Sequence, residues 1–338
     1  MNRDQKQFIN SLGFRYLGFL VLYIVCQVGF SRLFAYLLPA ELFADYYLVW
    51  IMLPMYLVCV PAGYFMIRGL PATGHLTQEK TFGPGQLILA ILIMYGMMYA
   101  GNLVGTFLNM IISALAGTDA TYAALEVVTT LDPLQNLLIV GLLGPVIEEL
   151  FFRKFLIDRL NRFGEVAAIV ISASAFGLFH GNITQFFYAT LIGLVLGYIY
   201  EKSGKIHYSI IAHATLNILS GVIAGWLLQV TGYSELTSTI SLLEEDFEAL
   251  LSYVTEHLGS LLAYGAYSTF LSTLSMAGIV LTIIFVFVPK TRKIHFTPGP
   301  DPLPQGEAAK TILGNVSVIL FIAVCVLMMV TAITGLPF

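Results

Sequence analysis

The sequence has 338 residues, of which 58% are hydrophobic and only 11% are charged, with a mean hydropathy of +0.84 and a formal net charge of −4. A water-soluble domain carries about 25% charged residues, so this composition excludes one, and the small net charge gives no reason to expect a nucleic-acid partner. Runs of about 20 apolar residues, long enough to cross a bilayer, recur from Phe14 to the C-terminus. We therefore predict an all-α, polytopic membrane helix bundle in contact with membrane lipids.

Polar breaks divide the chain into about nine predicted transmembrane helices, or eight if two short segments form one span. The predicted spans are Phe14–Leu38, Tyr46–Ile67, Gln86–Ala116, Leu134–Ile157, Glu165–Gly181, Gln185–Tyr200, His207–Val230, Leu258–Val288 and Thr311–Thr334. They group into three regions: N-terminal spans in residues 1–132, a four-span core in 133–230, and residues 231–338 with an outer helix and two C-terminal spans. The outer helix is predicted at 241–258, where apolar residues are three and four apart and the polar face is acidic.

The connections between these spans alternate in charge. Fifteen of the sixteen Lys and Arg residues fall in every other connection, and only Arg32 breaks the rule. The basic set comprises Arg3, Lys6 and Arg15; Arg68 and Lys80; Arg153, Lys154, Arg159 and Arg162; Lys202 and Lys205; and Lys290, Arg292, Lys293 and Lys310. Since basic connections remain in the cytoplasm, we predict a cytoplasmic N-terminus and an outward C-terminus.

The fourth predicted span contains charged residues, which are energetically costly inside an apolar membrane helix. Glu148 and Glu149 lie inside it, and each ionised carboxylate would cost about 2.5 to 3.5 kcal/mol if unpaired. Glu149 and Arg153 are four residues apart and can form an ion pair on one helix face. Glu148 lies about 100° around the helix and must face a polar cavity or another helix, where it is suited to act as a general base. Pro145 lacks an amide hydrogen and is expected to loosen the helix just before the acids.

Two later spans carry polar side chains at helical spacing. His180 follows Phe176 by four residues, and Asn217 follows His213 by four. Each alone could be an interhelical hydrogen-bonding group. Together with Glu148 they supply a base and donors for an oxyanion, which suffice for peptide hydrolysis. Helical rise places Glu148 about 15 Å, His213 about 9 Å and His180 about 22 Å from the cytoplasmic ends of their helices. We therefore expect a pocket in the cytoplasmic half or near the middle of the membrane, reached from the side or from the cytoplasm.

These motifs resemble those of the CAAX protease and bacteriocin-processing family, also called the CPBP or Abi family of intramembrane endopeptidases. The sequence Glu148-Glu149-Leu150-Phe151-Phe152-Arg153 looks like its Glu-Glu-x-x-x-Arg motif, Phe176 to His180 like its Phe-x-x-x-His, and His213 to Asn217 like its His-x-x-x-Asn. The three occur in order within Leu134 to Val230.

The resemblance implies an intramembrane glutamate-type protease that needs no metal ion or other cofactor. Glu148 with His180 would activate water, His213 and Asn217 would stabilise the oxyanion, and Glu149, Arg153 and Phe176 would support the site. The substrate would be a membrane-associated peptide that is hydrophobic or lipidated, such as a prenylated one. The protein would lie in the plasma membrane of a prokaryote, and neither its substrate nor its oligomeric state follows from the motifs.

Three alternatives use the same residues. His180, His213 and a carboxylate could bind zinc in a membrane protease, because nitrogen and oxygen ligands suit catalytic zinc. A non-catalytic membrane scaffold or bacteriocin-immunity protein could use them for packing. A transporter could use intramembrane charges as an ion path. Inverted-repeat transporters have a pair of interrupted spans at corresponding positions, however, and the sequence shows no obvious pair of this kind.

Overall fold

The computed structural model describes residues 3–76, 82–118, 132–232, 247–288, 295–304, 306 and 308–334. Within these ranges every regular element is a helix and there is no strand, which confirms the predicted all-α class. Among the described residues, eight helical segments are long and apolar enough to cross a membrane, which confirms a polytopic membrane bundle.

The eight segments correspond to eight of the predicted spans. They are α1 (Arg3–Leu37), α3 (Tyr47–Ile67), α4 (Pro84–Ala116), the segment Pro133–Phe163, α10 (Ile183–Ser203), the segment Ile206–Val230, residues Leu250–Phe287 of α14 (Phe247–Phe287), and α16 (Val316–Thr334). The ninth predicted span is α9 (Glu165–Phe179), whose 15 residues rise only about 22 Å. The short helices α2 (Ala40–Asp45) and α15 (Ala308–Leu313) lie outside the spans.

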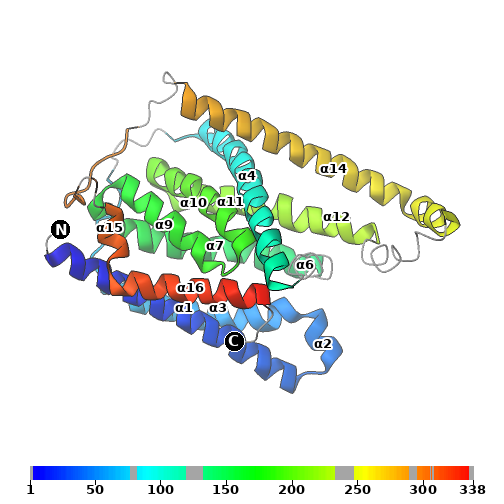
Figure 1. The fold of residues 1–338 in the computed structure, drawn as a ribbon, viewed down its shortest axis with the longest axis horizontal. Coiled ribbons are helices and arrows are strands. Elements are labelled where there is room, and N and C mark those ends of the chain that lie inside the picture. Colours follow the sequence, from blue (N-terminus) through cyan, green and yellow to red (C-terminus); the bar gives the residue numbers. More distant parts are fainter. Residues whose placement is uncertain are drawn as a thin grey trace.

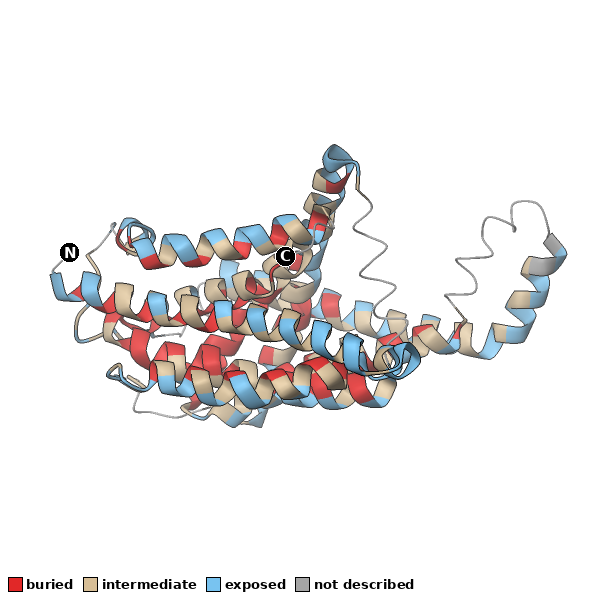
Figure 2. Cartoon of the chain, turned by 90° about the horizontal axis from the view of Figure 1, so that it is seen from below, coloured by how far each residue is buried: buried red, intermediate tan, exposed pale blue. Residues whose placement is uncertain are grey.

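The helices form a bundle with its core in the middle (Figures 1 and 2). α1 packs against α3 and α16 on one side, and α14 packs against α4 on the other. α10 lies between them, in contact with both α4 and α9. The α4–α14 contact is close because two glycines meet there: a Cβ added to Gly96 would lie 2.3 Å from the backbone of Gly278. Because α10 contacts α4, α9 and the segment Ile206–Val230, it lies in the interior of the bundle.

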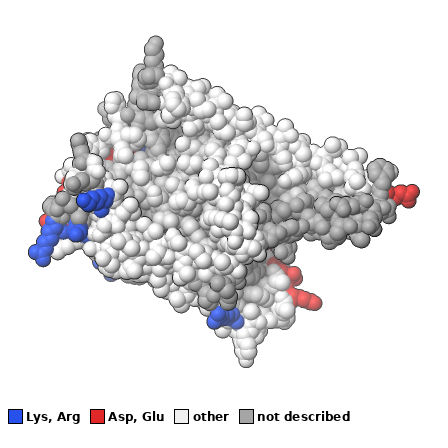
Figure 3. Space-filling model, in the orientation of Figure 1, with Lys and Arg blue, Asp and Glu red and all other residues white. Residues whose placement is uncertain are grey.

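Connections far apart in the sequence meet at one end of the bundle, which we call the basic end. The amides of Thr73 and Gly74 donate hydrogen bonds to the Asp158 carbonyl at 2.7 and 3.0 Å, and Arg162 pairs with Asp301 at 2.6 Å. Gln5 also donates to Asp301, and Lys202 pairs with Glu165. Five predicted basic connections thus share one end, and Figure 3 shows most of the visible Lys and Arg side chains there. Lys80, Lys290, Arg292 and Lys293 lie outside the described residues.

The separate outer helix predicted at 241–258 is not seen. Residues 241–246 lie outside the described residues, and from Phe247 onward the chain forms the single 41-residue helix α14. The reason is that no proline interrupts residues 247–287, so that the backbone hydrogen bonds continue into the apolar span. The beginning of α14 projects beyond the other helices at the right of Figure 2.

Candidate active site

The helix that carries the two glutamates changes its winding on either side of them. Residues Leu137–Leu143 (η1) and Leu150–Ile157 (η2) are π-helical, and the α-helical turn between them, α7 (Gly144–Glu149), ends with Glu148 and Glu149. π-helical turns inside α-helices are rare and often accompany functional sites. The acids therefore lie on a locally distorted helix rather than on a plain span.

Pro145 explains one of these distortions and the position of Asn217. The Gly144 amide donates to the carbonyl of Ile139, five residues earlier. In the same pattern the next amide would bond to Val140, but Pro145 has no N–H. The Asn217 side chain donates to the Val140 oxygen at 2.9 Å instead. Asn217 thus satisfies the carbonyl that the proline leaves without a backbone partner.

Glu149 is the buried centre of a charged cluster. Its carboxylate lies 3.1 Å from Arg153 Nε and 3.0 Å from His213 Nδ1, and neither the Glu149 nor the Arg153 side chain is exposed. The Arg153 contact is an ion pair by distance but lacks hydrogen-bond geometry, and the other two guanidinium nitrogens make no hydrogen bond to the described residues. The structure thus contains the ion pair expected from the four-residue spacing, with His213 as a third member.

His213 also faces the other carboxylate. Its Nε2 atom lies 3.6 Å from Glu148, whose side chain is 35% exposed. The imidazole therefore lies between the two glutamates, with one ring nitrogen toward each. As an imidazolium it would donate to both, which makes His213 a link between the buried ion pair and the accessible acid.

The Phe176 ring joins the histidines to this cluster. It lies edge to face with His180 at 4.8 Å and with His213 at 5.6 Å, and the Arg153 guanidinium lies over it at 4.8 Å. His180 Nδ1 lies 2.8 Å from the Phe176 carbonyl oxygen. Because a carbonyl only accepts, Nδ1 is the donor, and the neutral ring then keeps an acceptor lone pair on Nε2.

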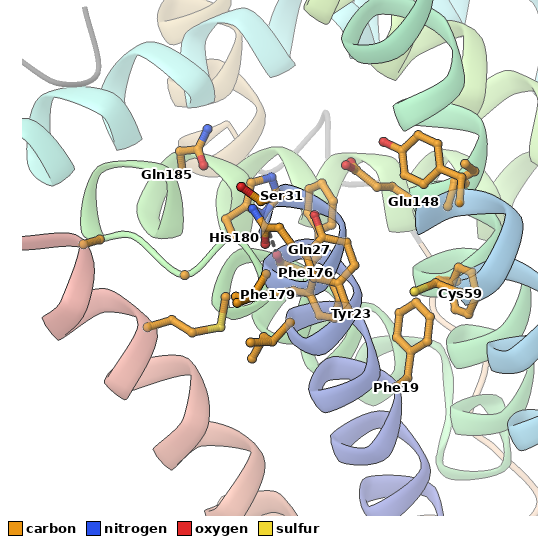
Figure 4. Close-up of a pocket in the computed structure, with 18 of the residues that line it drawn as sticks. Phe19, Tyr23, Gln27, Ser31, Cys59, Glu148, Phe176, Phe179, His180 and Gln185 are labelled. Carbon is orange, nitrogen blue, oxygen red and sulfur yellow. Dashed lines mark hydrogen bonds between the residues drawn. The ribbon is translucent and has the colours of Figure 1, made fainter. Parts of the chain in front are cut away.

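Glu148 and His180 line one pocket of about 630 Å³, at separate positions along its wall in Figure 4. His213 and Asn217 do not line this pocket. Of the four predicted catalytic residues, the structure thus places two at the cavity and two behind it. The predicted core at 133–230 does not form the cavity alone, because α1, α3 and α16 also contribute to its wall.

The pocket extends away from the basic end of the bundle. Its wall includes Arg32 near the end of α1, Tyr47 at the start of α3, Gln185 in the first turn of α10 and Thr331 near the end of α16. The physical reason is that α9 begins at the basic end and places His180 at its far end. The pocket therefore lies at the distance from the basic end that helical rise gives for His180, about 22 Å, and not at the distance of about 9 Å that it gives for His213.

Sequence reasoning missed the contribution of α1 and α3 to the site. Phe19, Tyr23, Gln27 and Ser31 of α1 all line the pocket, as does Tyr56 of α3. A Cβ added to Gly144 would lie 3.8 Å from Tyr56 Oη and 3.9 Å from Glu148 Oε1, so that these two polar atoms flank one small residue. The signal available in the sequence was the spacing of four between polar residues in an otherwise apolar first span.

The described residues contain no group of three His, Cys, Asp or Glu side chains arranged to hold a metal ion. The zinc alternative needs His180, His213 and a carboxylate as ligands, but only His213 contacts the two glutamates, and the ring of Phe176 lies near both histidines. The described residues of the site thus bring the two carboxylates to His213 and leave His180 apart from them.

The fold and the site define a multi-pass membrane protein with a carboxylate and a histidine at a cavity between its helices. Residues 130–219 match the family model "Type II CAAX prenyl endopeptidase Rce1-like". The chain is also 23% identical over 185 residues to a Bacillus subtilis (strain 168) protein named "Putative membrane peptidase YdiL", across 54% of this chain and 74% of that protein. No solved structure matches. The predicted resemblance to the CAAX protease and bacteriocin-processing family is confirmed over residues 130–219, and these similarities support a membrane protease of the CAAX type.

Proposed function

We propose that the protein is an intramembrane endopeptidase that uses Glu148 to activate water. The observation that carries this proposal is that Glu148 and His180, from two different helices, line the same pocket. A general base must reach the water that it deprotonates, and these two side chains have access to the cavity. The arrangement needs no cofactor, so that the acid and the imidazole supply the proton transfers.

The proposed reaction follows from these two groups. Glu148, assisted by His180 Nε2, accepts a proton from a water molecule whose oxygen attacks the scissile carbonyl carbon. The tetrahedral intermediate then breaks its C–N bond, and the proton passes to the leaving amine. His213 would hold the Glu148 carboxylate in position through its 3.6 Å contact, with Glu149 and Arg153 as its support.

The contacts favour a different oxyanion donor from those that the resemblance implies. His213 faces the glutamates, and Asn217 donates to Val140. Both are therefore proposed to position the site. The Tyr56 hydroxyl lines the pocket near Glu148 and makes no hydrogen bond to the described residues, so it is the group that we propose to donate to the oxyanion.

The proposed substrate is a hydrophobic or lipidated peptide at the membrane. Aromatic side chains cover much of the pocket wall, including Phe19, Phe151 and Phe179, and apolar chains bind to such surfaces. Under the positive-inside rule the basic end would be cytoplasmic, so that the N-terminus is cytoplasmic and the C-terminus outward. The proposed location is the plasma membrane of a prokaryote, in line with the similarity to a Bacillus subtilis protein.

The test is the release of peptides from membranes that contain wild-type protein, Glu148→Gln or His180→Ala. We expect labelling of new peptide N-termini, followed by mass spectrometry, to find products that only the wild type makes, while both variants insert and purify normally. Activity of wild-type protein should persist after dialysis against a chelator, whereas its loss and recovery with zinc would favour the zinc protease. If the wild type cleaves nothing, and cells with Glu148→Gln are still protected against a bacteriocin or still assemble the protein with its partner, then the protein is a scaffold or immunity protein.

A further inference from the structure

Helix α1 forms a graded wall from the interior of the pocket to its mouth. Phe19, Tyr23, Gln27 and Ser31 follow one another at intervals of four and all line the cavity, so they share one helix face (Figure 4). The wall changes from aromatic near Glu148 to polar near the mouth, where Arg32 is the next residue. The helix therefore presents amide, hydroxyl and guanidinium groups to whatever enters.

Arg32 is exceptional in charge as well as in position. It is the one Lys or Arg that lies away from the basic connections, and at this end the exposed charges of α2 are acidic, Glu41 and Asp45. The Arg32 side chain is exposed and makes no ion pair with the described residues. A basic residue at the mouth of a cavity that forms no ion pair with the described residues is available to bind an anion.

We propose that Arg32 binds a carboxylate of the peptide substrate and so selects anionic peptides. This rests on the proposed function, because it assigns a substrate feature to the same cavity. A guanidinium matches a carboxylate with two parallel hydrogen bonds. A peptide is favoured over a phospholipid because Gln27, Ser31 and Gln185 line the path to Arg32 and can bond to a peptide backbone, whereas an acyl chain cannot use them.

Helix geometry sets the distance between the carboxylate and the bond that is cut. Phe19 of α1 stacks on Phe151 with ring centroids 4.2 Å apart. Glu148 precedes Phe151 by three residues, a rise of about 4.5 Å away from the basic end, so that Glu148 lies at about the level of Tyr23 on α1. Arg32 follows Tyr23 by nine residues, a rise of about 13 Å. An extended peptide covers about 3.3 to 3.6 Å per residue, and thus spans this distance with about four residues. The selected carboxylate should lie about four residues from the scissile bond, either in an acidic side chain or at the peptide's own C-terminus.

The experiment uses full-length protein in nanodiscs of phosphatidylcholine, with and without phosphatidylglycerol, and a set of synthetic apolar peptides. Each peptide carries Glu, Gln or Lys at one position, with either a free or an amidated C-terminus, and kcat/KM and the cleavage site are measured by mass spectrometry. We expect wild type to favour the anionic peptide over its neutral partner by up to about fivefold, the upper range for an exposed ion pair. Arg32→Gln should bring this ratio to about one, and Arg32→Glu should favour the Lys peptide. Lys6→Gln, on the same helix at the basic end, is the matched control and should keep the wild-type ratio.

The two sources of the carboxylate separate in the same data. If amidation of the peptide C-terminus removes the preference for the anionic peptide, then Arg32 binds the C-terminal carboxylate. If only the change from Glu to Gln removes it, then Arg32 binds the glutamate side chain. A wild-type ratio near one, or an unchanged ratio in Arg32→Gln, overturns the proposal while leaving the protease intact. The proposal is also overturned if Arg32→Gln lowers kcat/KM equally for all peptides and only in nanodiscs that contain phosphatidylglycerol, because Arg32 would then bind a lipid headgroup. Absence of any Glu148-dependent cleavage would instead overturn the proposed function, and this proposal with it.

Discussion

The buried ion pair between Glu149 and Arg153 allows a quantitative test of how the site is held. Arg153→Met keeps most of the side-chain volume but removes the charge, which leaves a carboxylate with 0% exposure beside His213 and Ser209. Removing one partner of a buried pair costs about 3 to 5 kcal/mol, because the remaining charge stays desolvated. We expect Arg153→Met to lower the free energy of unfolding by that amount. Glu149→Gln in the same protein should recover at least about 2 kcal/mol, since it removes the unpaired charge.

The free energy of unfolding would be measured by titration with sodium dodecyl sulfate in mixed micelles, following helix content. The adjacent Lys154→Met is the control: Lys154 is 47% exposed and pairs with Asp158 at 2.8 Å, and exposed pairs contribute about 0 to 1 kcal/mol. A loss below about 1 kcal/mol for Arg153→Met, or no recovery in the double variant, would refute the view that the buried charge needs its partner.

Three further predictions address other parts of the bundle. Asn217→Ala should cost about 1 to 3 kcal/mol in the same titration, because a half-buried carbonyl within the bundle loses its donor. Adding Pro145→Ala should restore part of the loss, since alanine supplies an amide, and an additive loss would contradict this. Gly278→Val should cost about 1 to 3 kcal/mol by separating α14 from the Gly96 backbone, whereas an unchanged titration would mean that the contact is loose. Tyr56→Phe should lower kcat about a hundredfold with unchanged unfolding, and wild-type turnover would remove Tyr56 as the oxyanion donor.

The sequence predicted what depends on local periodicity. The spacing of four between Glu149 and Arg153 places them on one face of any helix, so the pair could be predicted without knowing its neighbours. The alternation of charged connections likewise predicted that Gln5, Asp158 and Asp301 would lie at the same end, because each apolar span must return the chain to the opposite side.

Contacts between distant segments could not be predicted in this way. Gly96 and Gly278 lie far apart in the sequence, yet a Cβ added to Gly96 would lie 2.3 Å from the backbone of Gly278, whereas a Cβ added to Gly221 would meet nothing within 4 Å. Such contacts depend on which helices become neighbours, and glycine spacing within one helix does not contain that information. The same holds for the pocket, whose wall combines α1 with helices more than 100 residues later.

Arg32 connects the charge pattern to the site. The positive-inside rule treats it as an exception, but the rule concerns only how spans are oriented, and one basic residue does not change the orientation that the other fifteen predict. A residue that does not serve orientation can serve binding. The nearby Glu41 and Asp45 would repel an anion over distances up to a Debye length of about 8 Å, so that attraction is confined to the mouth of the pocket itself. The charge pattern at this end therefore favours a carboxylate that is already aligned with the cavity over one that approaches elsewhere on the same surface.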